Sequence, residues 1–257
     1  MNFIDINTMI GSWSFGEPMF KDTKGLCAEM DRLNIRKAFT YHFLAAGYDP
    51  KVGNDALVEE IKDYNNIIGT MVLTPLIKIE FGGKEAVKDF MMTNRIGAIR
   101  LFPIDHSYTL ENWNMEEIFE ITNECSVPIF FDMRQRGGNM SEHFNDFYYL
   151  AKENPETPIV LLTVGYRHLR TIMKLLENCP NIYIDTSDFI TYRGIEDIVK
   201  HFGSKQILFG SRMPFIEGGV SIGRIIYSSI AETDKENIAY KNAERLLKNN
   251  RFTMKGE

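Results

Sequence analysis

The sequence predicts a single (β/α)8 barrel with an extra C-terminal helix, and three observations lead to that prediction. The chain has 257 residues, of which 44% are hydrophobic and 25% are charged, a composition typical of globular domains. Short β-rich runs alternate with amphipathic helical stretches, as in βα units around a parallel sheet, and eight such units fit about 250 residues. No linker or charge block divides the chain, so we expect one domain over residues 1–257.

Eight runs of β-forming residues are the expected strands. The runs that begin at Pro128 and Pro158 are almost continuously apolar, as expected of strands covered on both faces. A proline at the first position of a strand removes an N–H where the loss matters least. In order, the expected strands span residues 3–7, 36–41, 67–73, 97–102, 128–132, 158–163, 182–186 and 206–210.

Between these strands the apolar residues recur every three or four positions, which predicts helices with one buried face. Leu26, Met30 and Leu33 are one such set, and Leu169, Ile172 and Leu176 are another. Ser141 is the expected cap of a helix that carries Phe144. Thr233 and Glu236 have the spacing of a capping box for a last helix that runs to about Lys248. A doubly wound open sheet is the alternative topology, although no Gly-x-Gly-x-x-Gly motif follows the first strand.

Charge and cysteine usage bear on partners and location. The 29 Lys and Arg against 35 Asp and Glu give a net charge of −6, which argues against binding to duplex nucleic acid or to an anionic membrane surface. The three cysteines are scattered and show no zinc-binding or disulfide pattern. No secretory leader and no apolar run of about 18 residues is present, so we expect a cytoplasmic protein. The sequence leaves homo-oligomer formation open.

Motifs at the ends of the expected strands resemble one known family. Residues 4–11 read Ile-Asp-Ile-Asn-Thr-Met-Ile-Gly, which is similar to a first-strand pattern Ile-Asp-x-His-x-His-x-Gly. Residues 97–103 (Gly-Ala-Ile-Arg-Leu-Phe-Pro) and 207–215 (Ile-Leu-Phe-Gly-Ser-Arg-Met-Pro-Phe) are similar to its fourth and last strand segments. Eight segments of this kind follow in order from Ile4 to about Leu247. The chain thus resembles the amidohydrolase-related family of metal-dependent TIM-barrel hydrolases and decarboxylases.

The resemblance implies a divalent metal, but the chain departs from the family at every ligand position. The family uses two histidines of the first strand, one histidine after the fifth strand, one after the sixth, and an aspartate after the eighth. The residues at these positions here are Asn7, Met9, Asp132, Thr163 and Arg212. Arginine has no lone pair to offer, and one carboxylate beside a guanidinium does not hold Zn²⁺. We therefore expect no metal and no other cofactor.

The polar residues at the C-terminal strand ends are the candidate site, because barrel active sites lie at that face. Arg212 is predicted to orient or polarise a carbonyl or carboxylate, while Asp132 or His42 moves a proton. His42 is alternatively a rim residue without a catalytic role. Asp132 and Arg212 are expected to pair, either to fill the vacated metal site or to present a fork to an anionic ligand. The predicted substrate-binding residues are Asn7, Arg100, Arg134, Thr163, Asp185 and Ser187.

Loops near the predicted mouth add two further features. Residues 134–139 form a basic loop that is either solvated, or a lid or anion clamp hinged at Gly137 and Gly138. Four aromatic residues in the first and fourth loops either cover a pocket or pack the loops: Trp13, Phe15, Tyr108 and Trp113.

Three functions are compatible with these residues. The first is a metal-independent hydrolase or lyase that acts on a small anionic substrate such as a lactone, ester or carboxylate. The second is a catalytically inactive relative that binds a small molecule or a protein partner. The third is a metal-dependent hydrolase whose site is rebuilt from carboxylates, for which the candidates are Asp5, Asp132, Asp185 and Asp188.

Overall fold

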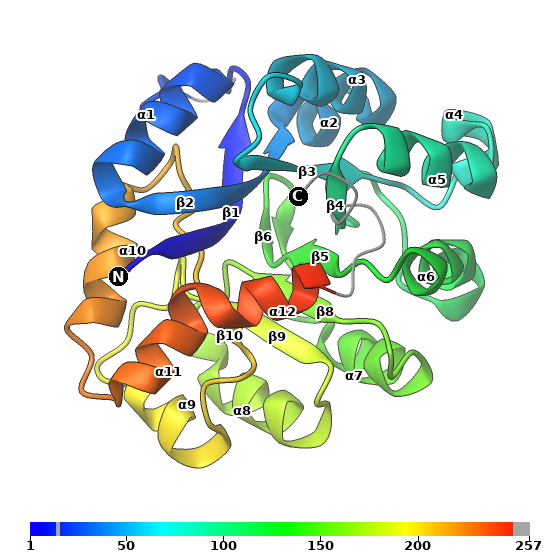
Figure 1. The fold of residues 1–257 in the computed structure, drawn as a ribbon. Coiled ribbons are helices and arrows are strands. Elements are labelled where there is room, and N and C mark those ends of the chain that lie inside the picture. Colours follow the sequence, from blue (N-terminus) through cyan, green and yellow to red (C-terminus); the bar gives the residue numbers. More distant parts are fainter. Residues whose placement is uncertain (14–15, 249–257) are drawn as a thin grey trace.

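The computed structural model describes residues 1–13 and 16–248 and confirms the barrel (Figure 1). Eight parallel strands pair in chain order, and the helices lie outside them. The strands are β1 (Phe3–Ile10), β2 (Ile35–His42), β3 (Ile67–Val72), β4 (Ile96–Leu101), β5 (Ile129–Asp132), β8 (Ile159–Leu162), β9 (Ile182–Asp185) and β10 (Ile207–Leu208). A separate hairpin follows β5 and consists of β6 (Arg134–Gln135) and β7 (Gly138–Asn139).

The helices alternate with the strands as predicted, and short additional helices lie in several of the connecting segments. They are α1 (Thr23–Leu33), α2 (Phe43–Gly47), α3 (Pro50–Ile61), α4 (Ile77–Phe81), α5 (Lys84–Thr93), α6 (Asn112–Cys125), α7 (Phe144–Glu153), α8 (Leu169–Asn178), α9 (Gly194–Phe202), α10 (Gly218–Ile226), α11 (Glu232–Glu236) and α12 (Asn242–Lys248). A 3₁₀ turn, Tyr166–His168, precedes α8, and a π-helical turn, Asn237–Lys241, joins α11 to α12. No described helix is long and apolar enough to span a membrane.

Two predicted helix caps are wrong. Thr233 lies inside α11, whose N-cap position is Ala231, so the spacing to Glu236 is that of two residues within one helix. His143 occupies the N-cap position of α7, while the backbone N–H of Ser141 donates to Asn139 Oδ1 at 3.0 Å in the preceding turn. In neither case does the predicted residue occupy the N-cap position.

The barrel closes between its first and last strands through individual backbone hydrogen bonds. The N–H of Ile6 donates to the carbonyl of Phe209 at 3.0 Å, and the N–H of Arg212 donates to the carbonyl of Asn7 at 2.9 Å. Strand β10 has only two residues, shorter than the expected 206–210, so this seam is held largely by the segment that follows β10. The closure therefore brings Arg212 against the residues of β1.

A β-bulge in β1 changes which side chains face the barrel interior. Ile4 and Ile6 belong to the inner apolar cluster, and strict alternation would turn Asn7 away from it. The register against β2 shifts between Asp5 and Thr8, which is the signature of one extra residue in β1. As a result Asn7 lies on the interior side directly after Ile6.

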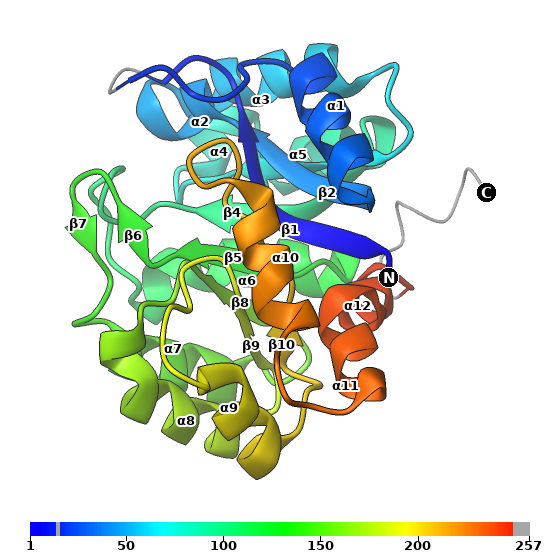
Figure 2. The same cartoon turned by 90° about the vertical axis from the view of Figure 1, so that its left-hand side faces the viewer.

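The two ends of the barrel differ, as Figure 2 shows. The hairpin β6–β7 lies at one end, beyond the C-terminal ends of the strands, and α12 lies at the other. Ala243 and Leu246 of α12 pack into the inner cluster with strand residues such as Phe39 and Phe130. The extra C-terminal helix therefore closes the N-terminal end and leaves the opposite end for a ligand.

Candidate functional site

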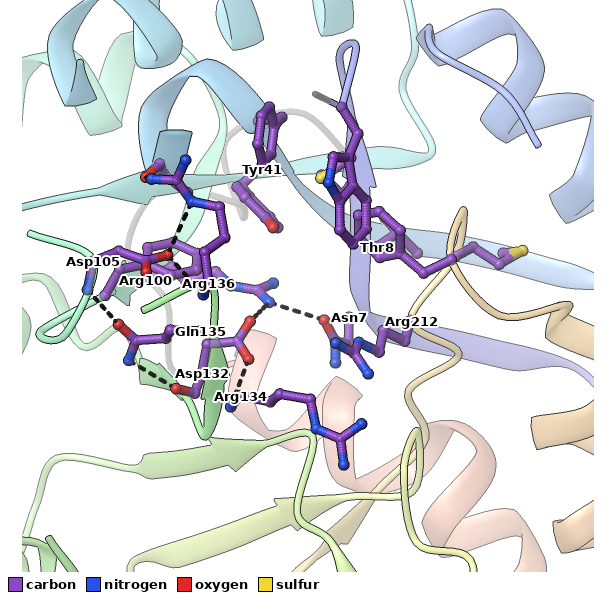
Figure 3. A pocket seen from close by; sticks show the side chains of 17 residues that line it. Asn7, Thr8, Tyr41, Arg100, Asp105, Asp132, Arg134, Gln135, Arg136 and Arg212 are labelled. Carbon is purple, nitrogen blue, oxygen red and sulfur yellow. Dashed lines mark hydrogen bonds and ion pairs between the residues drawn. The ribbon is translucent and has the colours of Figure 1, made fainter. Parts of the chain in front are cut away.

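A pocket opens at the C-terminal mouth of the barrel, and Figure 3 shows its lining. Its walls include five aromatic residues: Trp13, Tyr41, Phe43, Phe102 and Phe215. Its charged residues are four arginines and two aspartates: Arg100, Arg134, Arg136, Arg212, Asp105 and Asp132. Of the predicted site residues, five line this pocket: Asn7, Arg100, Asp132, Arg134 and Arg212. An apolar wall with convergent polar groups is the ordinary build of a small-molecule site.

Arg100 and Asp132 form a buried ion pair at the floor of this pocket. The guanidinium Nη2 of Arg100 donates to Asp132 Oδ2 and, at 3.0 Å, to Asn7 Oδ1. Its carbon Cζ lies 4.2 Å from the ring centroid of Tyr41. The side chains of Arg100 and Asp132 are 3% and 9% exposed, so each charge depends on the other for compensation.

The expected pair between Asp132 and Arg212 is not formed, because Arg100 takes the carboxylate instead. Asp132 Oδ1 accepts a second bond from the backbone N–H of Arg134 at 3.3 Å. The guanidinium of Arg212 has no hydrogen-bond or ion-pair partner within residues 1–13 and 16–248; its Cζ lies 6.0 Å from the ring centroid of Phe215. Arg212 is half-buried and lines the pocket, so it brings an uncompensated positive charge to the mouth.

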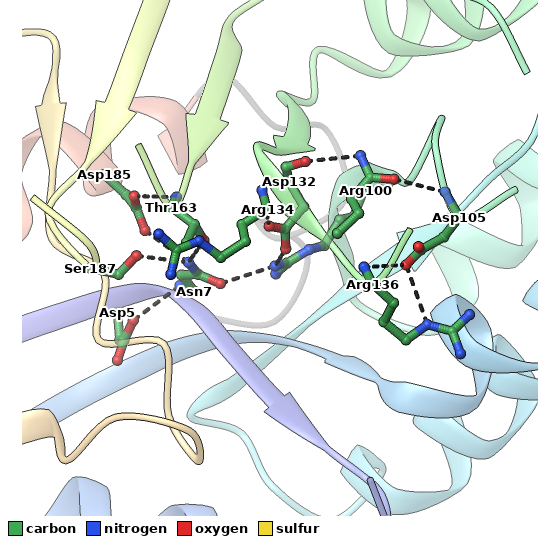
Figure 4. A network of polar contacts seen from close by, with 11 residues as sticks. Asp5, Asn7, Arg100, Asp105, Asp132, Arg134, Arg136, Thr163, Asp185 and Ser187 are labelled. Carbon is green, nitrogen blue, oxygen red and sulfur yellow. Dashed lines mark hydrogen bonds and ion pairs between the residues drawn. The ribbon is translucent and has the colours of Figure 1, made fainter. Parts of the chain in front are cut away.

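Asn7 connects four strands through one side chain (Figure 4). Its Oδ1 faces Arg100, which can only donate, so its Nδ2 must face the other partners. Nδ2 donates to Asp185 Oδ2 at 2.8 Å, to Ser187 Oγ at 3.2 Å and to Thr163 Oγ1 at 3.3 Å. The predicted residues Asn7, Thr163, Asp185 and Ser187 are thus brought together, but as a buried network beneath the pocket.

Thr163 and Asp185 hold the far side of that network. The N–H of Thr163 donates to Asp185 Oδ1 at 2.7 Å. Burial raises the pKa of the Asp185 carboxyl above its ordinary value, although the hydrogen bonds that it accepts act to lower it.

The backbone is in an uncommon conformation at two of the site residues. Thr163 has φ 60° and Arg212 has φ 63°, in the left-handed region, which is uncommon for residues other than glycine and most costly for a β-branched one. Both positions belong to the five at which the family resemblance implies metal ligands.

His42 lies at the end of β2 but does not line the pocket. Its Nδ1 accepts a hydrogen bond from the backbone N–H of Leu44 at 3.2 Å, so His42 caps the N-terminus of α2. The ring packs so closely on Gly11 that a Cβ there would approach Nε2 to 2.9 Å. Burial lowers the pKa of His42, which favours the neutral ring that this capping bond requires.

The hairpin β6–β7 is anchored to its surroundings. Gln135 Oε1 accepts hydrogen bonds from the backbone N–H groups of Ile104 (2.9 Å) and Asp105 (3.0 Å). Arg136 forms an ion pair with Asp105 at 3.4 Å. Arg134 forms an ion pair with Asp188 at 2.7 Å. The basic loop of residues 134–139 is therefore attached to the segment after β4 through Ile104 and Asp105, and to the segment after β9 through Asp188.

The sequence did not point to Tyr41, Gln135 or Phe215 as site residues. Tyr41 is the last residue of an expected strand. Its position at the C-terminal strand end, next to the candidate His42, is the sequence feature that could have indicated a site residue. Burial raises the pKa of the Tyr41 hydroxyl to about 12, so the phenol stays protonated at neutral pH. Of the four aromatic loop residues, Trp13 lines the pocket and contacts Phe215 edge-on, with ring centroids 3.6 Å apart.

The other three aromatic loop residues do not line the pocket. Tyr108 packs against the outer core, and Trp113 is 76% exposed on α6. Phe15 lies outside the described residues.

The residues at the implied ligand positions do not fit a divalent cation. Asn7 points its amide N–H₂ at the Asp185 carboxylate, and Asp132 is engaged by the Arg100 guanidinium. A cation placed among them would face donor hydrogens and a fixed positive charge. Within the described chain, no group of three or more His, Cys, Asp or Glu side chains is arranged to hold a metal.

Solved structures with the same fold include several decarboxylases. The 2,6-dihydroxybenzoate decarboxylase from Rhizobium has a TM-score of 0.76 and 14% identity over 96% of this chain and 98% of its own. The 5-carboxyvanillate decarboxylase from Sphingomonas paucimobilis has a TM-score of 0.72 and 11% identity over 96% and 99%. A dihydroxybenzoic acid decarboxylase from Polaromonas sp. JS666, with bound manganese and 2-nitroresorcinol, has a TM-score of 0.76 and 14% identity over 99% and 100%.

At these identities the similarity establishes the fold. A comparison with curated proteins finds no match. The family model described as amidohydrolase matches residues 90–248, from within α5 to the end of α12. That match covers more than half of the chain and most of the strands whose ends form the pocket. The chain belongs to the amidohydrolase family.

Proposed function

We propose that this protein is an enzyme that acts on a small anionic substrate, a lactone, ester or carboxylate, without the metal centre of its family. The observation that carries the proposal is the guanidinium of Arg212. It faces an aromatic-walled pocket, and no side chain of the described residues compensates its charge. A planar guanidinium presents paired N–H donors that match a carboxylate, which makes a carboxylate-bearing substrate its natural partner.

The surroundings of Arg212 support an anionic and planar ligand. Four of the chain's arginines line the pocket against two aspartates, although the whole protein carries a net charge of −6. The aromatic side chains of Trp13, Tyr41 and Phe215 offer flat surfaces to a ring. A related fold was solved as 2,6-dihydroxybenzoate decarboxylase in complex with 2,6-dihydroxybenzoate, a small aromatic carboxylate.

In the proposed hydrolysis, four side chains have roles. Arg212 orients the substrate and, with the protonated hydroxyl of Tyr41, donates hydrogen bonds to the carbonyl oxygen as negative charge develops on it. Asp132 accepts a proton from the attacking water as the new C–O bond forms, and returns it to the leaving oxygen when the old bond breaks. Arg100 holds the Asp132 carboxylate in place throughout. His42 is given no step, because it caps α2 outside the pocket lining.

Two alternatives follow from the same site. A binding protein without catalysis is favoured by the fact that both oxygens of Asp132 already accept hydrogen bonds, from Arg100 and from the Arg134 backbone. A metal site rebuilt from carboxylates is disfavoured by their partners, since Asp5, Asp132, Asp185 and Asp188 each accept hydrogen bonds or form ion pairs within the chain.

The first prediction concerns Arg212. The Arg212→Met variant is expected to bind benzoate and 2,6-dihydroxybenzoate roughly ten- to a hundredfold more weakly than the parent, because one charge-assisted fork is lost. Isothermal titration calorimetry measures the affinities, with neutral benzamide as the ligand control. Arg212→Lys keeps the charge without the fork and is expected to be intermediate. Arg170→Met, on the exposed face of α8, is the matched control and leaves affinity unchanged.

Turnover and metal content separate the three functions. A panel of aryl esters, lactones and hydroxybenzoates, assayed by product release, shows activity that Arg212→Met and Asp132→Asn both remove if the protein is the proposed enzyme. Ligand binding without any turnover identifies the binding protein. Stoichiometric zinc or manganese in the purified protein, lost together with activity on chelation, contradicts the metal-free proposal.

A further inference from the structure

A second cavity lies beside the first at the mouth of the barrel. It is lined at the ends of β5, β8 and β9 by polar and charged side chains, which include Arg134, Ser141, Thr163, Arg167, His168 and Asp188. Neither the proposed reaction nor the buried Asn7 network uses Arg167 or His168. The cavity is therefore an unassigned polar space next to the proposed substrate pocket.

Arg134 is the side chain that the two cavities share. It lines both, and its Nη2 forms an ion pair with Asp188 Oδ2 at 2.7 Å. The Arg134 side chain is 55% exposed, whereas that of Asp188 is 9% exposed, so the arginine is the partner with room to move. Beneath it, Thr163 lines the second cavity and accepts a hydrogen bond from Asn7, which lines the first, at 3.3 Å. Arg134, held by its ion pair with Asp188, is thus the exposed side chain that borders both cavities.

The charges of the second cavity favour an anion as well. Arg134 and Arg167 line it against the single carboxylate of Asp188, and the hydroxyls of Ser141 and Thr163 add donors. Arg167 is exposed, and within the described residues it has no ion-pair partner; its Cζ lies 6.0 Å from the ring centroid of Tyr166. Across the two cavities, five arginines face three aspartates.

We propose that the second cavity is a subsite for a second anionic group of the substrate, so that the substrate is an elongated dianion. One carboxylate lies at Arg212, and the other carboxylate or phosphate lies at Arg167. Arg134 determines specificity by bridging the two halves of the ligand. This inference rests on the proposed function of the first pocket and adds the shape and charge of its substrate.

The test compares monoanions with dianions of matched chemistry. Calorimetry with benzoate, terephthalate and the longer 4-carboxycinnamate is expected to show that at least one dicarboxylate binds tenfold or more tightly than benzoate. Arg167→Met removes this advantage and leaves benzoate affinity unchanged, and Arg170→Met leaves both unchanged. Both side chains are exposed, so the variants are expected to fold, and circular dichroism checks this.

Further outcomes separate this inference from the proposed function. Arg212→Met lowers the affinity for benzoate and the affinity for the dicarboxylates by the same factor if both kinds of ligand bind through the first pocket. Asp188→Asn releases Arg134 from its ion pair and is expected to raise dicarboxylate affinity several-fold relative to benzoate. If benzoate binds in an Arg212-dependent way but no dicarboxylate gains over it, the second subsite is refuted and the proposed function stands. If no carboxylate binds, both are refuted.

Discussion

Arg100 and Asp132 show how single residues stabilise the interior of this barrel mouth. Their ion pair joins β4 to β5, and Arg100 also donates to Asn7 of β1. Two of these three residues stand where the family resemblance implies metal ligands. The positive charge of the Arg100 guanidinium thus lies between two positions, Asn7 and Asp132, at which the family resemblance implies ligands of a metal cation. Removing either partner leaves the other buried and uncompensated, which is the costly change at such a site.

The second prediction tests this compensation. Asp132→Ala is expected to lower the free energy of unfolding by about 3–5 kcal/mol, because it leaves the Arg100 charge buried without a partner. The double variant Arg100→Met, Asp132→Leu replaces both charges with apolar groups and is expected to recover most of that loss. Urea unfolding measures both. A double variant that is as unstable as Asp132→Ala, or more so, contradicts the argument.

Among the elements, β1 shows where prediction from sequence reaches its limit. All eight strands are predicted within a few residues, because apolar runs and their turn signals are local. The bulge in β1 is not predicted. It is defined by the register of β1 against β2, and residues 4–11 contain no local sequence signal for it. The same holds for Arg100, because its pairing with Asp132 depends on which of the four arginines of the pocket the packed barrel places against that carboxylate. Five residues that line the pocket are among those predicted from the sequence, whereas their hydrogen-bond and ion-pair partners are not predicted.

The hairpin β6–β7 is held by one side chain whose role can be tested. Gln135 accepts bonds from the backbone N–H groups of Ile104 and Asp105, and it donates to the carbonyl of Asp132 at 2.9 Å. These bonds join the hairpin to the loop after β4. A hairpin anchored by these hydrogen bonds contributes one wall of the pocket.

The third prediction is therefore that Gln135→Leu destabilises this wall. The variant leaves two backbone N–H groups without an acceptor, which is expected to cost about 1–3 kcal/mol and to speed hydrogen exchange at Ile104 and Asp105. Hydrogen exchange with mass spectrometry localises the effect. Gln206→Leu, which removes bonds to Cys179 and Ile182 at the opposite end of the barrel, is the control. Equal exchange at residues 104–105 in both variants would rule out a local role for Gln135.

At the scale of the whole molecule, the barrel has one closed end and one charged, open end. The apolar face of α12 fills the N-terminal end, while the arginines gather at the other in a protein of net negative charge. The seam between β1 and the segment after β10 completes the ring. Asp5 lies at this seam, where its Oδ1 accepts hydrogen bonds from the backbone N–H groups of Asn7 and Ser211, both at 3.0 Å.

The fourth prediction concerns the pH dependence of folding stability. Burial raises the pKa of Asp5 to about 7, with a small further contribution from the nearby Asp185 carboxylate. In the unfolded chain the pKa is about 3.9, so between about pH 4 and 7 the folded protein binds the extra proton. Stability contributed by Asp5 therefore falls as the pH rises through this range and is fully lost only above the folded pKa.

Comparison with Asp5→Asn isolates this contribution. The difference in unfolding free energy between parent and variant is expected to shift by up to roughly 4 kcal/mol, in favour of the variant, from pH 4 to pH 8. Urea unfolding at several pH values measures it. A difference that does not vary with pH would show that Asp5 titrates normally in the folded protein.

The aromatic wall of the pocket also allows ligand binding to be followed by tryptophan fluorescence. The chain has two tryptophans: Trp13 lies in that wall against Phe215, and Trp113 lies exposed on α6, away from the pocket lining. The emission of the first depends on what occupies the pocket, while that of the second provides a constant solvent-exposed background. The protein thus carries its own optical reporter, and Trp113→Phe would leave a single tryptophan, at the proposed site of binding.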